Sequence, residues 1–269
     1  MYVSALLTCH NRRSTSVGSI EKLISINLPE GIYLNVVVVD DGSTDGTADA
    51  IRQKFPEIEM IQGDGSLFWC GGMRKAWNQA AKADPDFYLL ANDDTQIEPN
   101  ALVELLEIVG APASRRVGVG AIRDPEHGHA TYGGRRGARG ADLITPTGRP
   151  EHCTTFNANL VLVPRAVFQE LGVFHEAYTH GLGDFDYGFE ATRRGIEIIQ
   201  TPGFVGSCGH NSTEGTFMDR SLSRVRRFQL IQSPKGMPFR QWVLYNRRNS
   251  GCLWPYRCIT PYLRILLGL

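Results

Sequence analysis

The residues with the clearest chemical potential in this chain are adjacent carboxylates that directly follow an apolar run. Asn92-Asp93-Asp94 comes after the run at 87–91. Neighbouring carboxylates repel each other unless a cation or donor groups compensate their charge. Hard oxygen ligands of this kind suit Mg²⁺ or Mn²⁺, which can bridge protein carboxylates to a diphosphate. An Asp-rich turn that caps the next helix is the alternative interpretation.

A second acidic pair, Asp184 and Asp186, stands at the predicted start of a helix. A carboxylate there is stabilised as the anion, and one that faces an open site can act as a general base. Simple helix capping is the alternative, and for Asp186 it is the preferred one. Farther along, His210 offers a neutral imidazole for a metal, although a lone histidine is more often structural.

These polar groups are positioned by alternating strands and helices in the first 110 residues. The run of four valines at 36–39 is typical of a strand buried on both faces, as in a parallel sheet. We predict strands at 3–8, 35–40, 57–62 and 87–91, and helices in the dozen residues after Ser16 and at 47–55, 71–82 and 99–109.

Such an order favours an α/β fold, with helices on both faces of a mainly parallel sheet. Ligands of these sheets bind beyond the carboxyl ends of the strands. We therefore expect one rim to carry the polar residues that follow the strands, which are His10, Asn11, Arg12, Asp40, Asp41, Asp64, Asn92, Asp93 and Asp94.

The second half of the chain is less regular. Residues 124–152 are rich in Gly, Arg, Pro and His and predict a long loop or flap, a type of segment that is often functional. Strands are expected at 159–163 and 196–200. Helices are expected at 165–171 and 184–194, the latter stopped by Gly195.

The charge is unevenly distributed although the formal net charge is zero. Residues 221–269 contain nine Lys and Arg and no Asp or Glu, interleaved with aromatic residues. A basic, aromatic segment suits the inner face of an anionic membrane, where it lies on the surface. A helical appendage that packs on the catalytic domain, or an oligomer contact, is the alternative. Salt-dependent binding to nucleic acid is a weaker option, and no nucleic-acid partner is expected.

The six cysteines form no CxxC pair. We therefore expect reduced thiols in a cytoplasmic protein. A strand-like run starts almost at the first residue, which argues against a signal peptide. No apolar stretch reaches the length of a spanning helix.

Four motifs in order resemble family 2 glycosyltransferases of the GT-A fold. They are VSALLTCHNR at 3–12, VVVVDDGSTDGT at 36–47, YLLANDDT at 88–95 and GDFDYGFEATRRG at 183–195. The second is close to the family's second-strand signature and highly specific. The resemblance covers roughly Tyr2 to Asn211.

The resemblance implies a role for each matching residue. Asp184 would deprotonate the acceptor hydroxyl, Asp94 and His210 would bind the metal, and Asp186, His180 and Trp69 would lie near the acceptor. Core packing is the alternative for Trp69. The residues implied in binding the donor nucleotide are Thr8, His10, Asn11, Arg12, Asp40, Asp64, Gly72, Met73, Asn92 and Asp93.

The family pattern implies a catalytic domain at 1–220, with a nucleotide-binding half at 1–110 and an acceptor half at 111–220, followed by a tail at 221–269. Its reaction would be metal-assisted (Mn²⁺ or Mg²⁺) and inverting, with a UDP- or dTDP-sugar donor. The acceptor would be a saccharide or a polyprenol-linked saccharide in bacterial surface-polysaccharide synthesis. The protein would then be peripheral on the inner face of the cell membrane, and could form a homo-oligomer.

This sequence departs from the pattern at three motif positions: Asn92 replaces the usual first Asp of the metal motif, Gly183 replaces a frequent Glu, and Glu190 stands where Arg is common. A catalytically degenerate sugar-nucleotide-binding or scaffold protein is therefore an open alternative. A sugar-phosphate nucleotidyltransferase is a second one. It would carry a Gly-rich basic loop after the first strand, whereas this chain has Thr-Cys-His-Asn-Arg at 8–12.

Overall fold

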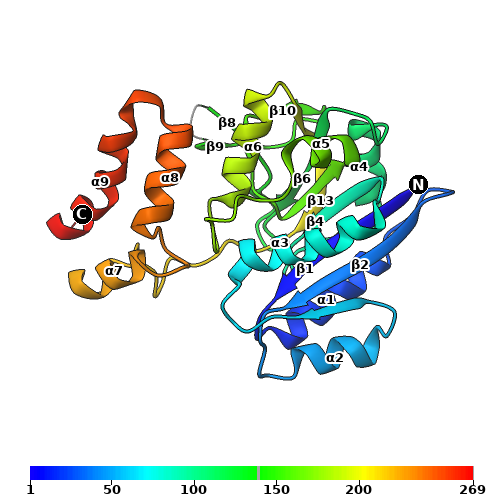
Figure 1. The fold of residues 1–269 in the computed structure, drawn as a ribbon, viewed down its shortest axis with the longest axis horizontal. Helices are drawn as coiled ribbons and strands as arrows, with labels where there is room; N and C mark the ends of the chain where they lie inside the picture. The colour runs from blue at the N-terminus through cyan, green and yellow to red at the C-terminus, as the bar shows by residue number, and fades with distance from the viewer. Residues whose placement is uncertain (138–139, 269) are drawn as a thin grey trace.

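The computed structural model describes residues 1–137 and 140–268, which form an α/β fold around one large sheet (Figure 1). The order of its main strands is β10-β13-β6-β12-β4-β1-β2-β3, with β5 paired to β13 and β7 to β6. The bounds are β1 (Tyr2–Cys9), β2 (Tyr33–Asp40), β3 (Glu59–Gln62), β4 (Phe87–Ala91), β5 (Gln96–Ile97), β6 (Arg116–Arg123), β7 (Ala130–Tyr132), β10 (Glu151–His152), β12 (Leu160–Pro164) and β13 (Glu197–Ser207).

The first four main strands are parallel, as their sequence pattern predicted. β1 pairs with β2 and β4, and β2 pairs with β3, all in parallel. β12 then runs antiparallel to both β4 and β6, while β13 is parallel to β6. The sheet is therefore mixed but mainly parallel.

Helices cover both faces of this sheet. One face packs on α1 (Arg13–Ile24), α2 (Thr47–Lys54) and α4 (Ala101–Val109). The other packs on α3 (Phe68–Ala80), α5 (Arg165–Leu171) and α6 (Gly183–Arg193). Along β2, Val36 and Val38 enter the first core and Val37 and Val39 the second. The valine run is thus buried on both faces, because alternate side chains of a strand point to opposite sides.

The second half contains strands that the sequence pattern did not indicate. β6 holds Gly118 and Gly120, which weaken the apolar alternation of a strand. A Cβ on Gly118 would lie 2.7 Å from Val109, and one on Gly120 would lie 2.8 Å from Val205. These glycines let neighbouring elements pack closely against β6.

The predicted loop or flap at 124–152 includes short strands among the residues that the structure describes. β7 and β10 join the main sheet, and β8 (Gly134–Arg136) pairs with β9 (Asp142–Leu143) and β11 (Thr155–Phe156) in a small second sheet. β13 also continues to Ser207, seven residues beyond its predicted end, with two irregularities in its register with β6.

The tail forms helices α7 (Arg224–Ile231), α8 (Phe239–Asn249) and α9 (Trp254–Leu267) at one end of the molecule (Figure 1). α8 lies against α6 and α9 against α8. Leu269, the last residue of the predicted tail, lies outside the described residues. Within the described part of the chain, no helix has the length and apolar character that crossing a membrane requires.

Candidate active site

A cavity of about 290 Å³ opens where β1, β2 and β4 end. The shared rim expected from the alternating strands therefore exists, and side chains from several elements meet there. The residues lining the cavity are Thr8, Cys9, His10, Arg12, Asp41, Gly65, Phe68, Trp69, Asp93, His180 and Lys235.

Asp93 and Asp94 face the guanidinium of Arg12 beyond the end of β4. Arg12 Nη1 lies 2.7 Å from Asp94 Oδ2 and 3.5 Å from Asp93 Oδ1. Ser16 Oγ donates a 2.7 Å hydrogen bond to Asp93. Burial raises the pKa of Asp93 to about 6, because desolvation disfavours its charged form. The guanidinium of Arg12 therefore offsets part of the negative charge of Asp93 and Asp94.

Asp41 shapes the loop that forms one wall of the cavity. Its carboxylate accepts hydrogen bonds from the backbone N–H groups of Gly65, Leu67 and Phe68, at 2.9, 3.2 and 2.8 Å. Phe68 is held at φ +52°, in the left-handed region that side chains rarely adopt. Asp41 therefore fixes the backbone that presents Phe68 to the cavity.

α3 brings Trp69 and Gly72 to the ends of the first and fourth strands. Trp69 Nε1 donates a 2.8 Å hydrogen bond to Asn92 Oδ1. The indole of Trp69 thus positions Asn92, which stands where the family pattern has its first metal-motif Asp. A Cβ on Gly72 would lie 2.1 Å from Thr8 Oγ, so only glycine allows this helix to approach β1 so closely. Met73 is fully buried in the core, and its side chain does not line the cavity.

The remaining predicted nucleotide residues, Asp40, Asn11 and Asp64, are not lining residues of the cavity. Asp40 is fully buried and accepts a 3.1 Å hydrogen bond from the backbone N–H of Ser43. Asn11 is exposed at φ +49°, and its side-chain oxygen accepts from the N–H of Thr44 at 2.8 Å. Asp64 is exposed.

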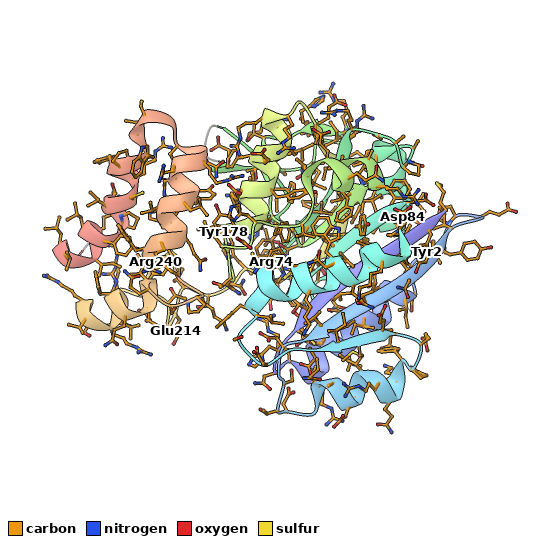
Figure 2. All side chains as sticks on the ribbon, viewed as in Figure 1. Tyr2, Arg74, Asp84, Tyr178, Glu214 and Arg240 are labelled. Carbon is orange, nitrogen blue, oxygen red and sulfur yellow. The ribbon has the colours of Figure 1, made fainter. Side chains whose placement is uncertain are left out.

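His180 reaches the cavity from the segment before α6. Its Nδ1 is buried and has no hydrogen-bond partner among the described residues. Burial, together with the positive charges of Lys235 and Arg12, lowers the pKa of His180 to about 4, so its ring is neutral at pH 7. Arg74 fastens this segment through a 2.6 Å hydrogen bond to the carbonyl of Tyr178 (Figure 2).

Lys235 comes from the loop between α7 and α8 and lines the same cavity. Its side chain is exposed, and it has no ion pair among the residues that the structure describes. The basic tail thus adds a second cation to Arg12 at the cavity. The sequence analysis missed this residue, because only the excess of positive charge in the tail indicated that such a contact could form.

Asp184 lies in the first turn of α6, four residues after His180; it is half-buried and is not among the residues that line the cavity. Its carboxylate accepts from the backbone N–H groups of Ala158 at 3.2 Å and Phe185 at 2.9 Å. Burial raises the pKa of Asp184 to about 6, against the lowering effect of these hydrogen bonds. A carboxylate with such a pKa is ionised at pH 7 yet basic enough to accept a proton.

Asp186, two residues after Asp184 in the first turn of α6, binds the tail. The buried carboxylate accepts from Arg248 Nε at 2.9 Å and from Asn249 Nδ2 at 2.7 Å. Asp186 therefore joins α6 to α8. Its predicted contact with the acceptor stays a prediction.

The predicted metal ligands Asp94 and His210 come from the ends of different strands. Asp94 Oδ1 lies 3.6 Å from Cys208 Sγ, just after β13, and the exposed ring of His210 lies 5.9 Å from that of Tyr132. Carboxylate and imidazole are both ligands of divalent cations, and the guanidinium of Arg12 shows that a positive charge is accommodated beside Asp94. The metal role of Asp94 and His210 stays a prediction.

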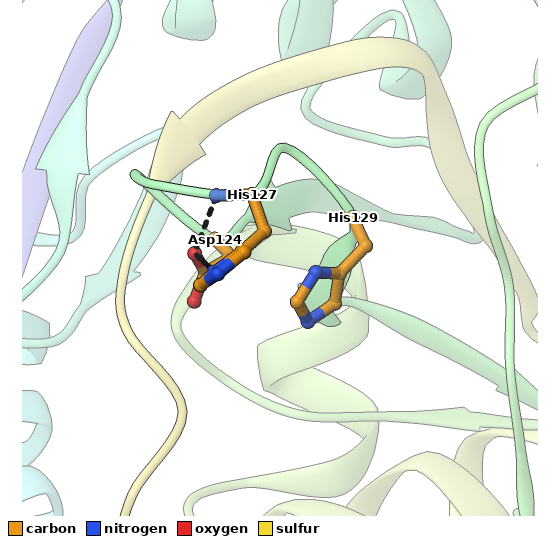
Figure 3. Close-up of side chains that lie close together, drawn as sticks. All are labelled: Asp124, His127 and His129. Atoms are coloured by element: carbon orange, nitrogen blue, oxygen red, sulfur yellow. Dashed lines mark hydrogen bonds and ion pairs between the residues drawn. The ribbon is translucent and has the colours of Figure 1, made fainter.

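Another group of potential metal ligands lies on the β6–β7 hairpin (Figure 3). Donor atoms of Asp124, His127 and His129 lie within 4.8 Å of one another, and both histidines are exposed. Asp124 also accepts from the backbone N–H groups of Glu126 and His127, so it shapes the hairpin loop. Such exposed groups are common without an ion.

Comparison with known sequences identifies the family of the region that carries the first three of the four motifs. The sequence model described as Glycosyl transferase family 2 matches residues 4–171. The N-acetylglucosaminyl-diphospho-decaprenol L-rhamnosyltransferase of Mycobacterium tuberculosis is 25% identical over 214 residues. That alignment covers 67% of this chain and 68% of the relative.

Solved structures with a similar fold include GalNAc-T7 with UDP, GalNAc and Mn²⁺ (TM-score 0.58, 13% identity). They also include Staphylococcus aureus TarS 1–349 with UDP-GlcNAc (0.59, 15%) and the Pyrobaculum calidifontis mannosyltransferase PcManGT with GDP-Man and Mn²⁺ (0.54, 17%). The matches cover 97–99% of this chain, and 57%, 73% and 74% of those chains, respectively. At these identities the likeness shows the fold.

Proposed function

Because this chain belongs to glycosyl transferase family 2 and has the GT-A fold, we propose that it moves a sugar from a nucleoside-diphosphate sugar to a lipid-linked saccharide. The rhamnosyltransferase relative acts, by its name, on N-acetylglucosaminyl-diphospho-decaprenol. An acceptor of that class, used in surface-polysaccharide synthesis on the inner side of the membrane, agrees with the acid-free basic tail of this chain.

The donor diphosphate would lie in the cavity between Arg12 and Lys235. The guanidinium of Arg12 and the ammonium of Lys235 suit a ligand with two phosphates, because hydrogen bonds between charged groups are stronger than hydrogen bonds between neutral groups. The base and ribose would lie toward the other predicted nucleotide residues, which are Thr8, His10, Asn11, Asp40, Asp64, Gly72, Asn92 and Asp93. UDP- and dTDP-linked donors are the proposed classes; TarS 1–349 has been solved with UDP-GlcNAc.

A divalent metal belongs to this proposal, and Asp94 and His210 would hold it. When bound, such an ion neutralises negative charge on a leaving diphosphate. GalNAc-T7 and the Pyrobaculum mannosyltransferase have both been solved with Mn²⁺. In this chain Arg12 also contributes positive charge beside the proposed metal ligand Asp94, because its guanidinium bridges Asp93 and Asp94.

Asp184 would act as the general base in a single displacement. Its carboxylate takes the proton of the acceptor hydroxyl while that oxygen bonds to the anomeric carbon, and the bond from this carbon to the diphosphate oxygen breaks. Attack from the face opposite the leaving group inverts the anomeric configuration. The observation that carries this assignment is the half-buried Asp184 carboxylate, with a pKa raised to about 6, four residues after the cavity residue His180.

The test is Asp184→Asn. Removing a general base costs about 10²–10⁴-fold in rate, so transfer should fall by that factor while nucleotide-sugar affinity stays within about twofold. Glu170→Gln, which affects an exposed ion pair with Arg115 outside the cavity lining, is the matched control. Transfer by the Asp184→Asn protein at the wild-type rate would refute the assignment. A wild-type protein that binds nucleotide sugars but transfers none would favour the degenerate scaffold.

A further inference from the structure

A second, larger hollow lies on the other side of the Asp184 segment from the donor cavity. It has a volume of about 580 Å³, within the range of about 300–1,000 Å³ typical of small-molecule sites. Leu182 and Phe185, the residues on either side of Gly183-Asp184, line it together with residues of α8 and α9. His180 lines the donor cavity. The segment 180–185 therefore separates the two spaces, and Asp184 belongs to it.

The lining of this groove is mainly apolar and aromatic. Phe185, Trp242, Tyr245 and Tyr256 contribute rings, and Leu253 adds an aliphatic side chain. Apolar surface of this kind favours an apolar ligand, because removing it from water is favourable. The polar and charged groups of Asn249, Ser250 and Arg257 are also among the lining residues. Such a set suits a ligand that is mostly hydrocarbon with an anionic end.

α9 connects this groove to an exposed apolar face. Tyr256, Ile259, Leu263 and Leu266 are exposed by 71%, 51%, 48% and 55%, and their spacing of three or four residues places them on one side of the helix. The opposite side, including Tyr262, is buried against the other tail helices. Tyr256 belongs both to the groove lining and to the exposed face, so the groove opens beside that face.

Charge around the two features favours an anionic lipid surface. Arg257 and Arg264 lie on the same helix, and the whole tail from residue 221 contains no acidic residue. An amphipathic helix with apolar and basic residues lies in the plane of an anionic interface. When the exposed apolar face of α9 lies in the interface, the Arg and Lys side chains of the tail would contact the phosphate groups of the lipids.

We propose that the groove between α6, α8 and α9 binds the first isoprene units of a polyprenyl diphosphate acceptor, while the exposed face of α9 lies in the membrane surface. This inference rests on the proposed function and adds to it a binding site for the lipid. The lipid would rise from the membrane along Tyr256 and pass Phe185. Its saccharide would then extend past Asp184 toward the donor cavity, where the displacement takes place.

The experiment measures binding of farnesyl diphosphate to the full chain by titration calorimetry, with inorganic diphosphate as the comparison. Thr260→Trp fills the groove, because Thr260 lines it. It should weaken farnesyl diphosphate binding about tenfold or more and leave diphosphate binding unchanged. The matched control is Leu266→Glu, in the exposed face but outside the groove lining. It should keep farnesyl diphosphate binding and lose affinity for vesicles of phosphatidylglycerol and phosphatidylcholine.

Equal affinity of the wild type for farnesyl diphosphate and inorganic diphosphate would overturn the inference. So would unchanged farnesyl diphosphate binding by Thr260→Trp, or by Ser250→Leu if the first variant does not fold. A dimer in light scattering that Thr260→Trp converts to a monomer would assign the groove to a second copy, and also overturn it. None of these readouts needs a sugar donor, so failure of the groove is distinguishable from failure of transfer.

Discussion

At the scale of single residues, environment decides which carboxylates can do chemistry. Asp41 and Asp186 are both buried, but the first holds three backbone N–H groups and the second holds Arg248 and Asn249. Asp184 accepts from the backbone N–H groups of Ala158 and Phe185, and burial raises its pKa to about 6. The three carboxylates look alike in the sequence, whereas most of their hydrogen-bond partners come from distant segments that no local pattern reveals.

The raised pKa of Asp184 predicts the pH dependence of transfer. A general base must be ionised, and Asp184 gains its proton as the pH falls through about 6. Transfer at saturating substrates should therefore be level above about pH 7 and fall about tenfold per unit below about pH 6. The rate measured from pH 5 to 8, with circular dichroism to confirm folding, checks this. A level rate down to pH 5 would contradict the assignment of Asp184 as the base.

Because Lys235 lines the cavity, we expect this tail residue to contribute to the affinity for the nucleotide donor. Lys235→Ala removes one cation from the cavity and should weaken binding of the nucleoside diphosphate about 10–100-fold, the equivalent of about 1.5–3 kcal/mol for a charged hydrogen bond. Arg240→Ala, elsewhere in the basic tail, is the control and should leave affinity unchanged. Calorimetry with UDP and dTDP measures both. Equal loss in the two variants would indicate a general effect of tail charge.

At the scale of elements, much of the first half could be predicted from the sequence. β1, β2, β4, α2 and α4 lie within a few residues of their predicted bounds, because strong apolar runs and short Gly- or Asp-rich turns delimit them. β6 was missed since its glycines interrupt the pattern, and they are needed for packing against Val109 and Val205. The short strands of 124–152 depend on pairing with distant partners, which a local pattern does not contain.

The approach of α3 to β1 predicts a large difference between two glycine substitutions. Gly72→Ala places a Cβ 2.1 Å from Thr8 Oγ and should lower the free energy of unfolding by about 1–3 kcal/mol. Gly18→Ala, inside α1 with nothing within 4 Å of the new Cβ, should raise it by about 0.5–1 kcal/mol. Urea denaturation measures both. Equal stability of the two variants would contradict the close contact at Thr8.

The ion pair between α6 and α8 predicts that the tail can be released without unfolding the core. Asp186 is 3% exposed and Arg248 31%, so Asp186→Asn leaves a partly buried guanidinium with a weakened partner. Amide exchange should become faster in α8 and α9 and stay slow in β1 and β4. Glu170→Gln, at an exposed pair with Arg115, is the control and should change neither. Faster exchange throughout the chain would argue against a separable tail.

At the scale of the whole molecule, the fold places the cavity proposed for the donor and an apolar groove on two sides of one short segment. The four-motif resemblance predicted the family and the GT-A fold, and both are confirmed. It did not predict that Lys235 of the tail would line the cavity, or that the tail helices would form a groove with α6. Those features depend on how the three tail helices pack beside α6, and composition indicated only their charge.

We propose that this chain transfers a sugar from a nucleotide donor to a lipid-linked saccharide. The most direct measurement incubates the purified full chain with N-acetylglucosaminyl-diphospho-polyprenol, Mn²⁺ and each of a panel of UDP-, dTDP- and GDP-sugars, and weighs the lipid product by mass spectrometry. One donor class should add one sugar residue, and Asp184→Asn should abolish this addition. No mass increase with any donor, from protein that is folded and binds the nucleotide, would contradict the account.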